Sequence, residues 1–167
     1  MEATAKPFPY ILRAAGLEDL ELICRHREAM FRASGRPETD LQAMRSPFRH
    51  WLARELEQGR YFGLIAECLG AQVGGVGTMV LEWPPHPSHP DQAQRGYILN
   101  LFVEPGHRGH GLGAVLMSAA EADLVERGVG YAFLHATGQA RPLYAATGLL
   151  TTSEMAKPRL GAARSIA

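Results

Sequence analysis

The stretch VEPGHRGHGLGAVLM, Val103–Met117, decides how the rest of the chain is interpreted. Residues 106–113 hold four glycines, two histidines and one arginine, between an apolar run and a segment with helical patterning. Glycine loses much backbone entropy when it is ordered, so glycines gathered at a helix start indicate that something must approach bare backbone. The first N–H groups of a helix lack partners and lie at its positive end. The turn therefore predicts a phosphate site, to which Arg108 adds charged donors.

Three phosphate-binding patterns can be compared with this turn. The P-loop requires a lysine after its second glycine, and the turn has none. The dinucleotide fingerprint matches loosely as Gly109-x-Gly111-x-x-Ala114, but the next expected strand ends FLHATG, without the acidic residue that binds a ribose. A glycine-rich turn that binds nothing is the structural alternative.

The third pattern resembles motif A of the GNAT superfamily of N-acetyltransferases, [QR]-x-x-G-x-[GA], with Arg108, Gly111 and Gly113 in its fixed places. Downstream, LHATGQARPLYAATGLL (134–150) resembles the family's second half, a strand and then a helix that carries A-x-x-[LF]-Y. The opening ILRAAGLEDLELICRHREAMF (11–31) is similar to the family's first strand and helix. The resemblance spans most of the chain.

Hydrophobic periodicity and turn residues predict a single α/β (mixed α+β) domain over residues 1–167. We expect a GNAT-like mixed central sheet of six to seven strands with helices on both faces. The resemblance implies that the sheet splays between the motif A strand and the strand that follows. The glycines at 74, 75 and 77 predict a bulge or a close backbone approach. The expected strands are 9–15, 61–68, 73–83, 96–103, 130–136 and one or two in 149–160, and the expected helices are 16–35, one from Ser46-Pro47 to Gly59, 111–128 and 139–147.

In GNAT proteins the motif A turn holds the pyrophosphate of acetyl-CoA, and the pantetheine arm lies along the preceding strand. The resemblance implies acetyl-CoA as cosubstrate and Tyr144 as the general acid, since a phenol with a pKa of about 10 is protonated at neutral pH. Thr137 stands where many relatives have an Asn. The implied cofactor-binding residues are Leu101, Phe102, Val103, Arg108, Gly109, His110, Gly111, Leu112, Gly113, Thr137, Ala140, Leu143 and Tyr144.

The general base and the acceptor are less determined. Some relatives carry Glu or His at the places held here by Tyr97 and Leu99, so that base is absent from this chain. The candidates are Glu82 and His135, with Asn100 only as a residue that positions water. Loss of the amine proton to water through a chain of hydrogen bonds is the alternative. The resemblance implies transfer of an acetyl group to a primary amine by direct attack in a ternary complex. A transferase that uses another acyl-CoA and a non-catalytic CoA-binding sensor are the alternatives.

Composition limits the partners. Lys plus Arg and Asp plus Glu both number 17, so the net charge of zero gives no global reason to expect nucleic acid or an anionic membrane. The pairs His86-x-x-His89 and His107-x-x-His110 lack a nearby third ligand, so no metal is expected.

The chain has no long apolar run and no signal-peptide pattern, which predicts a cytoplasmic protein. We expect a homodimer, because the closing strands would leave a sheet edge that needs cover.

Overall fold

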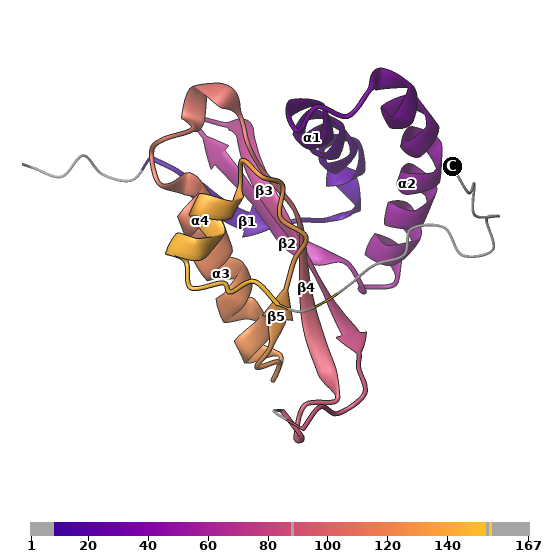
Figure 1. Cartoon of the computed structure of the whole chain (residues 1–167). Helices are drawn as coiled ribbons and strands as arrows, with labels where there is room; N and C mark the ends of the chain where they lie inside the picture. The colour runs from indigo at the N-terminus through magenta and orange to yellow at the C-terminus, as the bar shows by residue number, and fades with distance from the viewer. Residues whose placement is uncertain (1–8, 88, 153, 155–167) are drawn as a thin grey trace, which may run out of the picture.

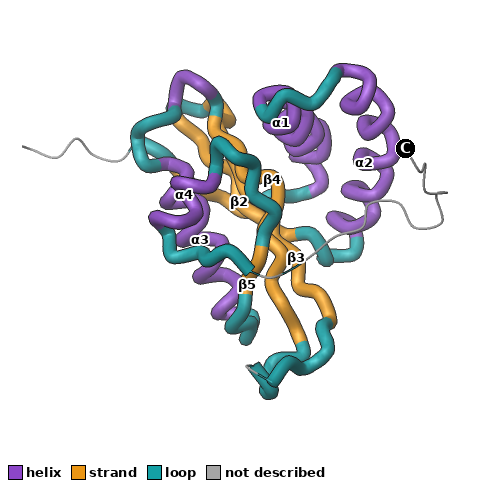
Figure 2. Tube along the Cα trace, in the orientation of Figure 1, coloured by secondary structure: helices purple, strands orange, loops and turns teal. Residues whose placement is uncertain are grey.

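The computed structural model describes residues 9–87, 89–152 and 154, and its centre is a mixed five-stranded sheet (Figures 1 and 2). The strands lie in chain order, β1 to β4 are antiparallel, and β5 runs parallel to β4. The predicted mixed α+β fold class is confirmed. The strands are β1 (Ile11–Ala14), β2 (Phe62–Cys68), β3 (Ala71–Glu82), β4 (Gln94–Val103) and β5 (Ala132–Phe133).

Helices cover both faces of the sheet, as Figure 1 shows. The helices α1 (Leu20–Ala33) and α2 (Glu38–Glu57) lie on one face, and α3 (Leu112–Glu126) and α4 (Arg141–Ala146) lie on the other. Short 3-10 turns, η1 (Leu17–Asp19) and η2 (Pro105–His107), precede α1 and α3.

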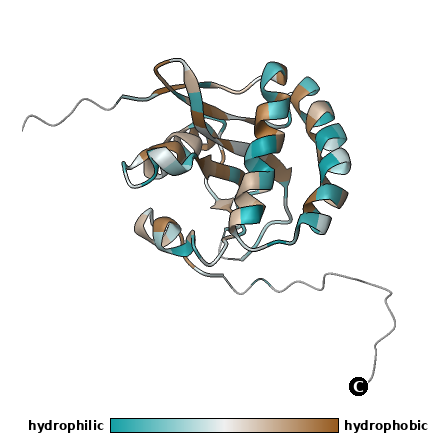
Figure 3. Ribbon diagram, turned by 90° about the horizontal axis from the view of Figure 1, so that it is seen from above, coloured by the Kyte–Doolittle hydropathy of each residue, from teal (hydrophilic) through white to brown (hydrophobic). Residues whose placement is uncertain are grey.

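Two hydrophobic cores result, because successive side chains of a strand point to opposite faces. On β4, Ile98 packs with the α3 core, whereas its neighbour Leu99 packs with the core under α1 and α2. Ala66 and Ile65 of β2 divide in the same way. In Figure 3 the central strands are largely brown, whereas the helices on the right, α1 and α2, alternate between brown and teal, as amphipathic helices do.

The expected count of six to seven strands was too high for the described part of the chain, which holds five. Residues 149–152 form no strand, and the rest of the expected closing segment lies outside the described residues. The strand expected over 130–136 is confined to Ala132–Phe133, which pair with Gly96 and Tyr97 of β4.

The start of α2 also differs from its prediction. Pro47 was interpreted as the first residue of the helix, but α2 begins at Glu38 and runs through Pro47. Proline inside a helix removes one hydrogen bond and destabilises it by about 3 kcal/mol. The helix nevertheless buries Leu41, Phe48 and Leu52, of which Phe48 and Leu52 pack in the core under α1 and α2, and this burial outweighs the local preference.

The predicted splay and bulge are both present around β4. Beyond Tyr97, β4 has no register with β5, so the two strands separate along the second half of β4. The pairing of β3 with β4 shifts between Gly75 and Gly77, and Asn100 there has φ of 55°. A Cβ on Gly77 would collide with the ring of Tyr61, which explains a glycine inside this strand.

Candidate active site

A cavity of about 460 Å³ opens where β4 ends, α3 begins and α4 crosses. The glycine-rich turn, the last residues of β4 and the α4 segment bring distant parts of the sequence together here. All of the predicted cofactor-binding residues line it except His110. The cavity is also lined by Met30 and Ala33 of α1, by Ser34 directly after α1, and by His107, Ala114 and Gln139. Sequence reasoning missed the α1 residues, because only the packing of α1 on the sheet brings them there.

The backbone amides of the turn are largely free. The His107 N–H donates to the Glu104 carbonyl and the Arg108 N–H donates to the Pro105 carbonyl, at the two ends of η2. Among the described residues, the amides of residues 109–114 find no backbone acceptor, and the first bond of this region runs from Val115 to Gly111. A row of unpaired donors at the start of a fifteen-residue helix is the arrangement that binds phosphate.

Two glycines hold the turn in a conformation that other residues adopt with strain. Gly109 has φ of 76° and Gly111, the residue before α3, has φ of 81°. A Cβ at either position would meet nothing within 4 Å, so the protein itself does not require this open space. The glycines therefore provide both the left-handed turn and an uncovered backbone beside the cavity.

Arg108 and His107 flank the turn with polar groups. The Arg108 Nε donates to the Val103 carbonyl at 2.8 Å, which fixes the root of the side chain at the end of β4. The guanidinium group lies 5.7 Å from the centroid of the Phe102 ring and is exposed, which leaves donors to point at an anion. The His107 Nδ1 lies 3.2 Å from the Tyr10 hydroxyl.

Tyr144 reaches the same cavity from α4. It lines the cavity together with Leu143 and Thr137, and its half-buried ring also contacts the α3 core. Burial raises the pKa of Tyr144 above that of a free phenol, so the hydroxyl keeps its proton at neutral pH. No hydrogen bond of this hydroxyl to another described residue is found, which leaves the proton available to a ligand.

A second cavity, of about 740 Å³, adjoins the first through Ser34, Thr137 and Gln139, which line both. Its other walls are the end of α1, the residues before α2, and His135. The His135 Nδ1 lies 3.2 Å from the Tyr97 hydroxyl, and the two rings meet edge to face. Glu82, the other base candidate, is exposed at the end of β3 opposite Gln94 and lines neither cavity.

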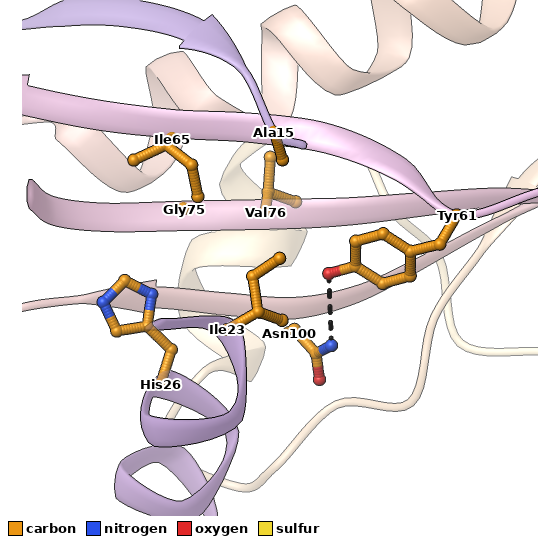
Figure 4. A pocket seen from close by; sticks show the side chains of 8 residues that line it. All are labelled: Ala15, Ile23, His26, Tyr61, Ile65, Gly75, Val76 and Asn100. Atoms are coloured by element: carbon orange, nitrogen blue, oxygen red, sulfur yellow. Dashed lines mark hydrogen bonds between the residues drawn. The ribbon is translucent and has the colours of Figure 1, made fainter. Parts of the chain in front are cut away.

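A buried polar cluster supports the irregular part of β4 from the α1 side. The Arg27 Nη1 donates to the Asn100 Oδ1 at 2.6 Å, and the Asn100 Nδ2 donates to the Tyr61 hydroxyl at 3.3 Å. Figure 4 shows the Tyr61–Asn100 contact beside a cavity of about 10 Å³ that His26 also lines. Burial lowers the pKa of His26 to about 4 and raises that of Tyr61 to about 12, so both side chains are neutral at neutral pH.

Among the described residues, no cluster of three or more His, Cys, Asp or Glu side chains is placed to hold a metal ion. No described helix has both the length and the apolar character that crossing a membrane requires.

The family model described as Acetyltransferase (GNAT) family matches residues 20–149, which include the turn, both base candidates and Tyr144. The chain belongs to the GNAT acetyltransferase family. A GCN5-related N-acetyltransferase from Ralstonia eutropha JMP134 is 55% identical, with a TM-score of 0.87 over 90% of this chain and 98% of that one. No curated protein matches the chain.

Two more distant structures share the GNAT fold. One is a predicted acetyltransferase from Clostridium acetobutylicum with acetyl-CoA, 22% identical, with a TM-score of 0.80 over 90% of this chain and 96% of that one. The other is an aminoglycoside acetyltransferase from an uncultured soil metagenomic sample in complex with sisomicin, 20% identical, with a TM-score of 0.66 over 93% and 97%. Membership of the GNAT family implies acyl transfer from an acyl-CoA.

Proposed function

We propose that the protein transfers the acetyl group of acetyl-CoA to a primary amine by direct attack in a ternary complex. The observation that carries this proposal is the cavity at the turn. Unpaired amides and two left-handed glycines form its phosphate end, and the Tyr144 phenol lies in the same cavity. In a turn that binds nothing, we would expect the backbone amides to be paired or the space beside them to be filled by side chains. The free amides of residues 109–114 and Arg108 would hold the pyrophosphate.

The rest of the cavity suits the pantetheine arm and the thioester. Within the part of the chain that the structure describes, residues Leu101–Val103 have no partner strand on the β5 side, so their backbone groups can bind an extended ligand as an added strand would. A backbone N–H on this edge would polarise the thioester carbonyl. Thr137, in place of the family's usual asparagine, offers a hydroxyl that both donates and accepts. The thioester supplies the acetyl group and a leaving thiolate.

Tyr144 is the proposed general acid. The amine nitrogen forms its bond to the carbonyl carbon, the carbon–sulfur bond breaks, and the phenol gives its proton to the departing sulfur. Because burial raises the pKa of Tyr144, the phenol is fully protonated before each turnover. The phenolate regains a proton from solvent after the thiol leaves.

We assign the general base to His135 rather than to Glu82, because His135 faces the second cavity, through which an amine can reach the first. With the Nδ1–H donating to the Tyr97 oxygen, Nε2 keeps a lone pair for the amine proton.

We also propose a homodimer in the cytoplasm. Its support is that the outer edge of β5 has no partner within the described residues. Light scattering tests it, and a mass near 18.2 kDa would refute it.

A thermal-shift comparison tests the cofactor, followed by an amine panel with detection of the free thiol. We expect acetyl-CoA and CoA to raise the Tm of the protein and NAD to leave it unchanged. Thiol release with at least one amine supports the transferase. Protection by CoA without thiol release from any amine would favour the sensor, and protection by NAD alone would favour the dinucleotide alternative.

A further inference from the structure

We propose that the acceptor amine also bears a carboxylate, as amino acids and peptides do, and that Arg36 selects it. This inference rests on the proposed function and concerns the second cavity, between the end of α1 and His135. It names the chemical class of the acceptor, which membership of the family leaves open.

Neither cavity has an acidic residue in its described lining. The acidic residue that follows the cavity wall in sequence, Glu38, is already neutralised, because its carboxylate accepts hydrogen bonds of 3.0–3.1 Å from Arg32. Arg45 also lies 3.9 Å from the same carboxylate. An acceptor with several positive charges would find no counter-charge on these walls.

Cations, in contrast, lie on and behind the wall. Arg36 lines the second cavity, its side chain is exposed, and it makes no ion pair with another described residue. Arg27 lies behind Phe31 of the same wall, 4.9 Å from the centroid of the ring, and no described carboxylate pairs with it. Burial lowers the pKa of Arg27, whereas a carboxylate partner would raise it. The field in this cavity therefore favours an anion.

The segment that carries Arg36 is held in place by its own backbone. The Arg36 N–H donates to the Phe31 carbonyl at 3.1 Å, and the Gly35 N–H donates to the Arg32 carbonyl at 3.0 Å. Gly35 has φ of 85°, and Pro37 fixes the chain on the other side. The backbone from which the Arg36 side chain extends is thus constrained. Its planar guanidinium group can bind a carboxylate through two parallel hydrogen bonds.

Three matched peptides test the proposal: alanyl-phenylalanine, its C-terminal amide, and alanyl-arginine amide. They share an alanyl α-amine, and they differ in carrying an anion, no charge or a cation beyond it. We expect the free acid to bind the CoA-saturated protein about three- to tenfold more tightly than the amide in calorimetry, and the arginine amide to bind most weakly. Thiol release should follow the same order in kcat/KM.

Two variants assign the effect. Arg36→Glu should remove or reverse the order, while its Tm and CoA affinity stay unchanged, since Arg36 is exposed and unpaired. Arg25→Glu is the matched control, because Arg25 is an exposed arginine of α1 that lines neither cavity, and it should keep the order.

Equal binding of acid and amide, tightest binding of the arginine amide, binding of none of the three, or an order that survives Arg36→Glu would each overturn the proposal. The transferase function is judged separately, by CoA protection and by thiol release with a panel of simple amines. If thiol release fails with every amine, the calorimetric order still decides the charge preference.

Discussion

Arg27 donates from Nη1 to the side-chain oxygen of Asn100 at 2.6 Å, and this contact joins α1 to the bulge of β4. Asn100 has φ of 55°, a left-handed conformation that Asn adopts more readily than most residues. Both ends of its amide are engaged, because Nδ2 donates to Tyr61. The contact therefore fixes where β4 bends, next to Leu101, which lines the first cavity.

Arg27→Met tests this coupling. The methionine keeps an apolar stem between Phe31 and Phe48 but leaves the Asn100 oxygen without its donor. A buried acceptor without a partner costs about 1–3 kcal/mol, so the free energy of unfolding in urea should fall by that amount. We also expect a lower kcat, because the free edge of β4 loses its fixed position. Arg25→Met is the control, and an equal loss in both variants would contradict the assignment.

Gly111→Ala should separate backbone strain from ligand binding. Gly111 and Gly128 have φ of 81° and 79°, and a Cβ on either meets nothing within 4 Å. Alanine at either position should therefore lower the free energy of unfolding by about 1–2 kcal/mol. Of the two glycines, only Gly111 lines the first cavity, where we propose that CoA binds, so only Gly111→Ala should weaken CoA binding, by tenfold or more. Equal CoA affinities of the two variants would show that this backbone does not approach the ligand.

The two local motifs were accessible to sequence reasoning, because each is complete within a few consecutive residues. Residue type and spacing alone were enough to single out Gly109, Gly111 and the A-x-x-L-Y segment around Tyr144 as candidates. Arg27 gave no such signal, since its partner Asn100 lies 73 residues away and only the packing of α1 on β4 joins them. The prediction from Pro47 was wrong for a related reason. The local preference of proline for a helix start is weaker than the free energy gained by burying the side chains around it.

Acid should destabilise the protein through His26. Burial, and to a lesser extent the charge of Arg25, lowers the pKa of His26 from 6.5 to about 4, although Asp19 opposes the shift. Between these two values the unfolded chain binds a proton that the folded chain does not. Stability is therefore lost as the pH falls from about 6.5 to about 4, by up to about 3 kcal/mol.

His26→Phe should remove this part of the pH dependence. The substituted ring can keep the tilted ring contact with Phe102, whose centroid lies 4.8 Å away, and it replaces an Nε2 that has no partner within the described residues. Urea unfolding of both proteins at several pH values between 4 and 7 is the measurement. Parallel curves for the two proteins would mean that His26 titrates normally.

His135→Gln and Glu82→Gln, compared side by side, test the choice of base. His135 lines the second cavity and contacts Tyr97, whereas Glu82 lines neither cavity. We expect His135→Gln to lower kcat about a hundredfold or more and Glu82→Gln to change it less than threefold. CoA affinity should be unchanged in both. A large loss in Glu82→Gln alone would transfer the role of the base to Glu82.

Tyr144→Phe tests the general acid with little structural disturbance. The Tyr144 hydroxyl makes no hydrogen bond within the described residues and its ring is half-buried, so the phenylalanine should leave the Tm within about one degree. CoA affinity should change less than threefold, because the ring remains. If the phenol protonates the leaving sulfur, kcat should fall by about 10² to 10⁴. Since burial raises the pKa of Tyr144, the wild-type kcat should show no loss from its ionisation at neutral pH. Unchanged acetylation by Tyr144→Phe would show that another group, or water, protonates the thiolate.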